Sequence, residues 1–261
     1  MLVLAIGDIV GKPGRLAAKT LVPKLRKELN VDLVVANGEN AAGGFGLTPE
    51  VAAELWQAGI DIITSGNHIW NKREIYPLLD QESRLLRPAN YPPGAPGQGW
   101  TIWRRGAQAA AVVNLAGRVF LEPLDCPFRL IRDLLPQLKK ETPVVIVDFH
   151  GEATSEKVAF GWYVDGAASL VFGTHTHVQT ADERILPGGT GYITDLGMTG
   201  PRDGVLGVDR EIIIKRFFNQ LPARFTVAKG DTELSGILAD IDPASGRTMR
   251  IERVRESVVA E

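Results

Sequence analysis

The chain has 261 residues, of which 44% are hydrophobic and 23% are charged, as is ordinary for a globular protein with a sizeable core. Its 29 Lys and Arg nearly balance its 31 Asp and Glu, so the sequence offers no basic field that could hold a long nucleic acid. The single cysteine, Cys126, excludes an internal disulfide and a thiolate metal cluster.

Apolar runs of strand length alternate with helical patterns through the first third of the chain. Thr48 and Pro49 are typical of an N-cap and a first helical position, and they mark where the second helix begins. Such alternation indicates βαβ units and a largely parallel sheet. The predicted strands cover 2–7, 31–36 and 60–66, and the predicted helices cover 13–29 and 48–59.

The middle of the chain is less regular, and the tail alternates in the manner of antiparallel strands. A Pro/Gly-rich loop over 87–99 precedes the strand patterns WTIWRR and AAAVVNLAG, and a helical pattern over 128–140 leads into a strand over 143–150. After a glycine-rich connection, the segments ARFTVAKG, TELSGILADID and TMRIERVRES are separated by turn residues. We expect them to form hairpins that close one edge of a second sheet.

These patterns predict one α/β domain over 1–261, with two mixed sheets packed face to face and helices outside. The amino terminus MLVLAIGD lacks the basic region of a signal peptide, and no stretch approaches the ~20 apolar residues of a membrane span. We therefore expect a cytoplasmic protein with no membrane partner. The sequence leaves the oligomeric state open, a homo-oligomer included.

Polar side chains suited to metals follow five of the apolar runs. In open α/β sheets, ligands bind in the crevice outside the carboxyl ends of the strands. All four histidines of the chain lie at such ends. The candidates are Asp8, Glu39 with Asn40, Asn67 with His68, His150, and His175 with His177.

Taken singly, each candidate has a structural interpretation. Asp8 fits a turn or helix cap, Glu39 and Asn40 fit turn positions, and Asn67 fits a helix N-cap beside a core His68. The pair His175 and His177 is harder to explain, because residues i and i+2 of an extended chain point to one face. Two imidazoles near several strand-end oxygens indicate a cation.

The donor set narrows the choice of metal. Imidazole nitrogens mixed with carboxylate and amide oxygens, without sulfur, suit Fe, Mn, Zn or Co better than Mg or Ca. Six or seven donors exceed the needs of one tetrahedral zinc. They suit two transition-metal ions ~3.5–4 Å apart that share a carboxylate, the arrangement that activates water for in-line attack on phosphorus.

The order GD, GEN, GNH, lone His and GTHTH resembles the calcineurin-like metallophosphoesterase superfamily, whose general pattern is D-x-H, GD-x-x-D, GNH, H and GH-x-H. More narrowly, GDIVGKPGR, NGENAAGG, GNHIWNKREI, DFHGEATSEK and GTHTHVQTADERIL resemble the YmdB-like branch over nearly the full chain. The resemblance implies a four-layer α/β/β/α sandwich and hydrolysis of phosphodiesters, notably 2′,3′-cyclic nucleotides.

The chain departs from the general superfamily pattern at two positions, as the YmdB-like branch also does. Val10 replaces a ligand histidine, and Glu39 followed by Asn40 replaces the bridging aspartate. The resemblance implies Asp8, Glu39, Asn40 and His177 on one ion, and Glu39, Asn67, His150 and His175 on the other.

In this hypothesis two cations, with Fe or Mn favoured, generate a hydroxide that attacks phosphorus, and His68 protonates the leaving oxygen as general acid. Two alternatives remain open: the same site could act on a phosphomonoester or protein phosphate, or the chain could be a metal-containing regulator with little turnover.

Overall fold

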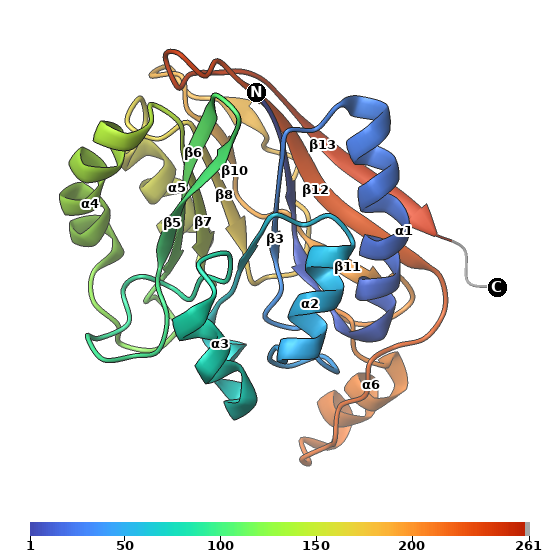
Figure 1. Cartoon of the computed structure of the whole chain (residues 1–261). Helices are drawn as coiled ribbons and strands as arrows, with labels where there is room; N and C mark the ends of the chain where they lie inside the picture. Colours follow the sequence, from blue (N-terminus) through green and yellow to red (C-terminus); the bar gives the residue numbers. More distant parts are fainter. Residues whose placement is uncertain (259–261) are drawn as a thin grey trace.

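Two mixed β-sheets form the centre of the molecule in the computed structural model, which describes residues 1–258 (Figure 1). The first sheet has the strand order β2-β11-β12-β1-β3-β4, with β13 paired to β12. Strands β1, β3 and β4 are parallel, whereas β12 is antiparallel to β1. Its strands are β1 (Leu2–Ile6), β2 (Asp8–Ile9), β3 (Leu33–Asn37), β4 (Ile62–Thr64), β11 (Met198–Pro201), β12 (Thr232–Ile241) and β13 (Thr248–Val258).

The second sheet has the order β5-β6-β7-β8-β10-β9. Strands β6, β7, β8 and β10 are parallel, and the edge strands β5 and β9 are antiparallel to their neighbours. Its strands are β5 (Trp100–Arg105), β6 (Gln108–Ala116), β7 (Val145–His150), β8 (Leu170–Thr174), β9 (Arg184–Ile185) and β10 (Gly191–Ile193).

The alternation of side chains along the strands separates three core layers. On β1, Leu4 and Ile6 pack toward the layer outside the first sheet, while Val3 and Ala5 pack into the layer between the sheets. From the opposite side Phe172 of β8 enters the same inner layer. Both faces of each central strand are therefore buried, which explains why these strands are almost entirely apolar.

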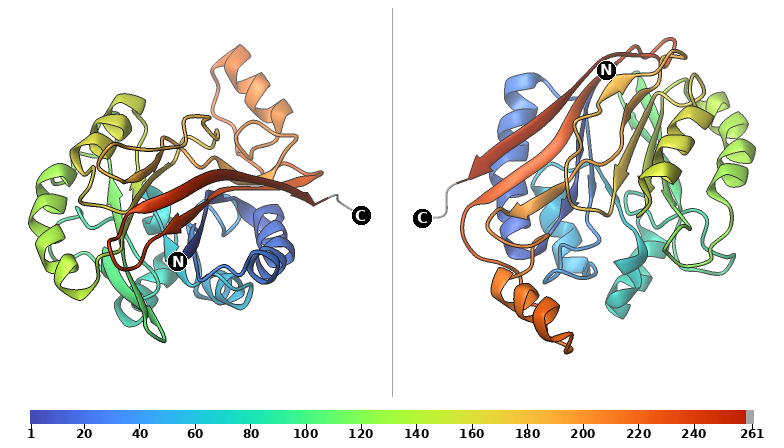
Figure 2. Two further views of the ribbon diagram at one scale, coloured as in Figure 1. Left: turned by 90° about the horizontal axis from the view of Figure 1, so that it is seen from above. Right: turned by 180° about the vertical axis from the view of Figure 1, so that it is seen from behind.

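Helices cover both outer faces, and the predicted four-layer α/β/β/α arrangement is confirmed (Figures 1 and 2). Helices α1 (Gly11–Leu29) and α2 (Pro49–Gln57) lie on the first sheet, and α4 (Pro127–Glu141) and α5 (Thr154–Tyr163) lie on the second. The predicted cap of α2 is present, since the Thr48 side chain accepts a hydrogen bond from the Val51 amide. Short helices η1 (Asn67–Asn71), η2 (Arg73–Ile75) and α3 (Tyr76–Gln81) follow β4.

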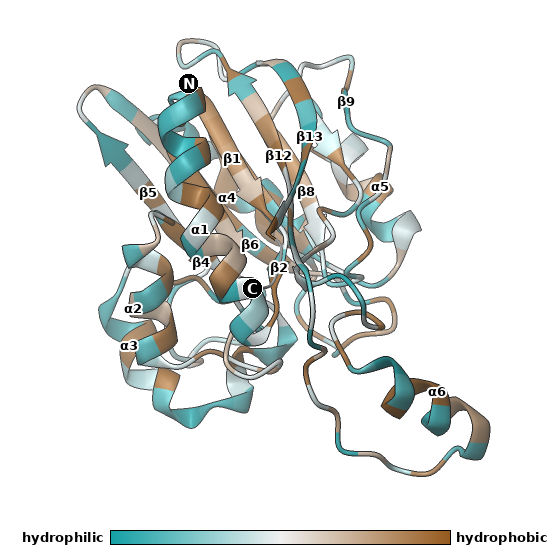
Figure 3. Ribbon diagram, turned by 90° about the vertical axis from the view of Figure 1, so that its right-hand side faces the viewer, coloured by the Kyte–Doolittle hydropathy of each residue, from teal (hydrophilic) through white to brown (hydrophobic). Residues whose placement is uncertain are grey.

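Two expectations for the tail were wrong. The segment 223–230 does not form a strand, and only an isolated bridge joins its Val227 to Val208. The hairpin of β12 and β13 does not close an edge of the second sheet but joins the sheet of the amino-terminal strands, because β12 pairs with β1. The sequence patterns also missed α6 (Arg210–Asn219), which projects from the body in Figure 3.

Within residues 1–258, none of the helices combines the length and the apolar character needed to cross a membrane.

Candidate metal centre

The predicted polar residues meet where the two sheets come together at the carboxyl ends of their strands. The first sheet supplies Asp8 at the start of β2, Glu39 and Asn40 after β3, and Asn67 and His68 after β4. The second sheet supplies the three remaining candidates. His150 ends β7, and His175 and His177 follow β8.

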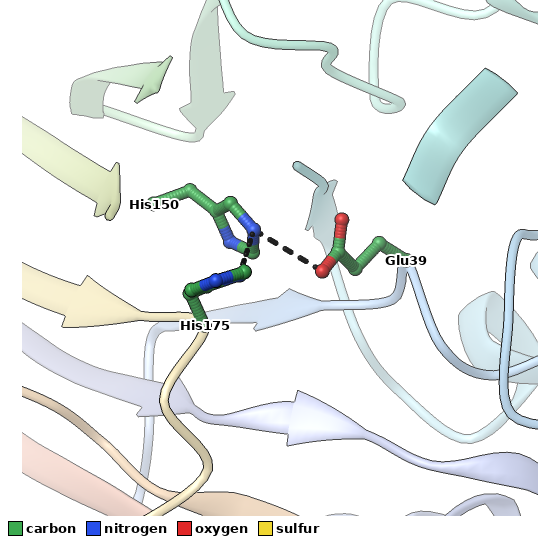
Figure 4. A group of neighbouring side chains, drawn as sticks. All are labelled: Glu39, His150 and His175. Atoms are coloured by element: carbon green, nitrogen blue, oxygen red, sulfur yellow. Dashed lines mark hydrogen bonds and ion pairs between the residues drawn. The ribbon is translucent and has the colours of Figure 1, made fainter. Parts of the chain in front are cut away.

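His150 occupies the centre of one half of this group. Its Nε2 lies 3.2 Å from Glu39 Oε1, 3.1 Å from Asn67 Oδ1 and 3.0 Å from His175 Nδ1. Figure 4 shows Glu39, His150 and His175 pointing toward one another from separate elements. Their ligand atoms all lie within 4.8 Å of one another, which is the spacing of side chains that share a cation.

Asp8, Asn40 and His177 form the other half. His177 Nε2 lies 3.2 Å from Asn40 Nδ2 and 3.8 Å from Asp8 Oδ1. Asn40 Nδ2 also lies 3.4 Å from Glu39 Oε1, so Glu39 touches both halves. The structure thus brings the seven candidate residues together, and their assignment to two ions stays a prediction.

The geometry of the His-x-His segment differs from the expectation. The extended strand ends at Thr174, and both His175 (φ 97°) and His177 (φ 64°) have left-handed backbone. The two imidazoles therefore do not share one face of a strand but reach different partners. A left-handed conformation is uncommon for residues other than glycine and clusters at functional sites.

A buried ion pair holds this turn. Asp195 Oδ2 accepts hydrogen bonds from the Thr176 amide at 3.2 Å and from Thr176 Oγ1 at 2.7 Å, and Lys157 Nζ donates to the same oxygen at 2.6 Å. Lys157 and Asp195 are 2% and 0% exposed. The amide of His175 in turn donates to Asp8 Oδ2 at 3.0 Å. These bonds fix the backbone around the two histidines.

Thr174 orients the His150 ring. Its hydroxyl donates to Asp148 Oδ1 at 2.7 Å, so its oxygen is left to accept from His150 Nδ1 at 3.0 Å. A second threonine, Thr64, donates to Asp148 Oδ2. This bond keeps a proton on Nδ1, so Nε2 is the nitrogen that faces Glu39 and Asn67 and that can bind a metal once it has lost its own proton. Asp148 is therefore linked to His150 by hydrogen bonds through Thr174, and its charge also helps to raise the pKa of the ring.

The charges of Glu39 and His150 shift the pKa values within this group. Burial alone raises the pKa of Glu39, but the charge and hydrogen bond of His150 outweigh it and hold the pKa at about 2. Burial alone lowers the pKa of His150, yet the negative charge of Glu39 raises it to about 9. For His175, burial and the positive charge of His150 lower the pKa to about 3. Without a metal, Glu39 and His150 form a buried ion pair and His175 is neutral.

Two further observations show that these residues suit a metal ion. The buried atoms Asp8 Oδ1 and Asn40 Oδ1 have no hydrogen-bond partner within the described chain, 1–258. An unpaired buried acceptor costs about 1–3 kcal/mol, so each points to a cation as its partner. In addition, a Cβ on Gly66 would lie 2.1 Å from His150 Nε2, which shows how closely the backbone approaches this ring.

A cavity of about 420 Å³ opens directly beside these residues. His68 lies in its wall, with its backbone amide donating to Glu39 Oε2 at 3.0 Å and its ring 5.1 Å edge-on from Phe45. Sequence reasoning missed Phe45 and the contribution of α6, although the glycine-rich stretch 41–46 marked a loop at this place. Glu152 was missed as well, and its Oε2 lies 3.0 Å from His175 Nε2.

Comparison with known proteins identifies the family. The model of the YmdB-like proteins matches residues 4–254. The chain belongs to the YmdB-like family. A 2′,3′-cyclic-nucleotide 2′-phosphodiesterase of Bacillus subtilis (strain 168) is 55% identical over 254 residues, covering 97% of this chain and 96% of the relative. The resemblance to the YmdB-like branch of the metallophosphoesterases is thus confirmed.

Two solved structures share the fold. A hypothetical protein from Thermus thermophilus superposes with a TM-score of 0.93 at 41% identity, covering 98% of this chain and 99% of that one. A structure described as a novel phosphatase, from Mycoplasma pneumoniae, gives 0.93 at 34% identity, covering 98% and 93%. A metallophosphoesterase-type fold implies divalent metal ions, and the YmdB-like chain provides a fitting cluster in Glu39, His150 and His175.

Proposed function

We propose that this protein hydrolyses phosphodiesters, with 2′,3′-cyclic nucleotides as substrates. The observation that carries the proposal is the convergence of seven candidate metal ligands, Glu39 among them, with buried acceptor atoms on Asp8 and Asn40 left without hydrogen-bond partners within residues 1–258. The Bacillus relative, whose name states this activity, supports the substrate class.

We assign the two candidate ion positions from the observed contacts. Asp8, Asn40 and His177 would hold one ion, Asn67, His150 and His175 would hold the other, and Glu39 touches both groups. Bound there, Fe or Mn, or alternatively Zn or Co, would supply an activated water and neutralise charge on the phosphate oxygens. The ligands come from both sheets, so the site exists only when the sheets are packed together, which favours a single domain over the chain.

The chain's own residues orient the reaction. Thr174 keeps the proton on Nδ1 of His150, and Asp195 holds the turn that carries His175 and His177. His68, held through its backbone by Glu39 and facing the cavity, donates a proton to the ester oxygen that leaves. The balance is one water consumed and one P–O bond of the ring broken, which gives a nucleoside monophosphate.

Substitution of His68 tests the assignment. His68→Ala is expected to lower kcat on a 2′,3′-cyclic nucleotide by about 10²–10⁴-fold, the usual worth of general acid catalysis, while metal content by mass spectrometry stays unchanged. The kcat of the variant on bis-p-nitrophenyl phosphate should fall much less, because p-nitrophenolate leaves without needing a proton. Loss of metal in the variant would instead make His68 a ligand.

Two other functions are separated by the same preparations. A phosphomonoesterase would turn over p-nitrophenyl phosphate faster than its diester counterpart. A metal-containing regulator would bind metal fully and hydrolyse no substrate of either class. Preference for cyclic diesters, with metal present after purification, is the expected result.

A further inference from the structure

The cavity beside the metal centre has walls from two separate parts of the chain. One wall is Phe45, in the loop after β3, together with His68. The other part is an arm that we define as residues 205–227, which contains α6 and contributes Leu206, Phe217 and Phe225. The lining also includes His175 and His177, so the cavity is continuous with the candidate catalytic groups.

The lining is dominated by apolar and aromatic side chains. The cavity volume of about 420 Å³ lies within the ~300–1,000 Å³ typical of small-ligand sites. Arg216 adds a guanidinium, which lies 4.9 Å from the centre of the Phe225 ring. Few polar groups therefore face a ligand at the arm end, in contrast with the cluster of imidazoles and carboxylates at the other end.

The arm helix leaves its aromatic side chains unpacked. None of the residues of α6 is buried, and Phe217 is 74% exposed although it faces the cavity. Figure 3 shows the helix standing clear of the two sheets, with hydrophobic segments along it. Ring surface of this kind beside a catalytic cluster is expected to be covered by part of the substrate.

We propose that this cavity is a nucleobase subsite, in which the base of the substrate stacks between Phe45 and Phe217 while its cyclic phosphate lies at the metal centre. The proposal rests on the proposed phosphodiesterase function and adds the determinant of substrate choice. Aromatic stacking accepts every base, because each has a π-face. With few polar groups to read base edges, the subsite admits all four bases and favours purines through their larger ring area.

The neighbouring residue provides a matched control. Phe218 is 85% exposed on the same helix but does not line the cavity. The experiment measures kcat/KM for 2′,3′-cyclic AMP, 2′,3′-cyclic CMP and the base-free methyl ribofuranoside 2,3-cyclic phosphate. The wild type is compared with Phe45→Ala, Phe217→Ala and Phe218→Ala.

The expected result concerns the ratio of kcat/KM for cyclic AMP to that for the base-free diester. In Phe45→Ala and Phe217→Ala this ratio falls by about 5- to 100-fold, mostly through KM, as alanine substitution of a stacking platform gives. In Phe218→Ala the ratio is that of the wild type, and the wild type itself prefers cyclic AMP over cyclic CMP.

Three results would overturn the subsite. The wild type could hydrolyse the base-free diester as well as cyclic AMP, or Phe217→Ala and Phe218→Ala could change the ratio equally. Sedimentation could also show that both variants dissociate an oligomer, which would make the arm an interface between copies of this chain. Failure of the proposed function itself looks different, since the wild type would then hydrolyse none of the three diesters.

Discussion

Adding one methyl group at Gly66 tests how tightly the metal centre is built. A Cβ at this position would lie 2.1 Å from His150 Nε2, 2.3 Å from Cδ2 and 2.4 Å from Cε1, whereas ordinary contact begins at 3.4 Å. The His150 ring is 0% exposed and is held at Nδ1 by Thr174, so it has little room to retreat. Gly66→Ala must therefore displace the ring or the backbone by roughly 1 Å, a shift that costs about 10²-fold in an active site.

The expected outcome is a folded protein with a damaged centre. Purified Gly66→Ala should retain the circular dichroism spectrum of the wild type, bind less than its full complement of metal by mass spectrometry, and lose about 100-fold in kcat/KM on a cyclic nucleotide. The control is Gly106→Ala in the β5–β6 turn, where a Cβ meets nothing within 4 Å and the left-handed φ of 59° costs only stability, by about 1–2 kcal/mol. Full metal content and wild-type turnover in Gly66→Ala would refute the packing argument.

Two further predictions follow from the charged groups. Lys157→Met leaves Asp195 as a buried charge without its cation, so the free energy of unfolding in denaturant should fall by about 3–5 kcal/mol. Adding Asp195→Asn should recover part of this loss, because no lone charge remains. A double variant less stable than Lys157→Met alone would contradict the prediction. Because the pKa of His150 is about 9 without metal and a ligand must be deprotonated, metal binding at pH 7 should release one proton and tighten about tenfold per pH unit up to pH 9. Calorimetry in buffers of different ionisation enthalpy measures that proton, and binding that does not vary with pH would exclude the Glu39–His150 pair as the resting state.

The convergence of the candidate residues at one edge could be predicted because it depends on local patterns. Each apolar run is long enough to cross its sheet once, so the polar residue that follows it, such as Glu39 after β3 or His150 at the end of β7, must emerge at the same edge. The alternation of core-facing side chains on β1 likewise follows from the two-residue period of a strand. The family resemblance then supplied the division of the seven residues into two groups, which periodicity does not contain.

The features that the sequence did not predict, such as the backbone of the His-x-His turn, depend on contacts between distant segments. The left-handed backbone at His175 and His177 is held by Asp195 and Lys157, which are separated from the turn in sequence and reach it only in the folded chain. The segment 223–230 alternates as a strand does, but the consecutive residues Phe225, Thr226 and Val227 all line the cavity. Its backbone pairs only briefly with residues 207–209, around the isolated bridge from Val227 to Val208, so it lines the cavity without becoming part of a sheet.

The two sheets supply different kinds of candidate ligand, which explains why the candidate centre lies where they meet. The first sheet contributes amide groups and the carboxylates of Asp8 and Glu39, which when ionised can only accept hydrogen bonds, and the second sheet contributes imidazoles. Neither set alone places the carboxylates beside imidazoles, and the fold brings the sets together by packing one sheet on the other. The unpaired oxygens of Asp8 and Asn40, judged within residues 1–258, show that this neutralisation is incomplete in the protein alone. Cations bound there would complete it, so we expect metal binding to stabilise the contact between the sheets as well.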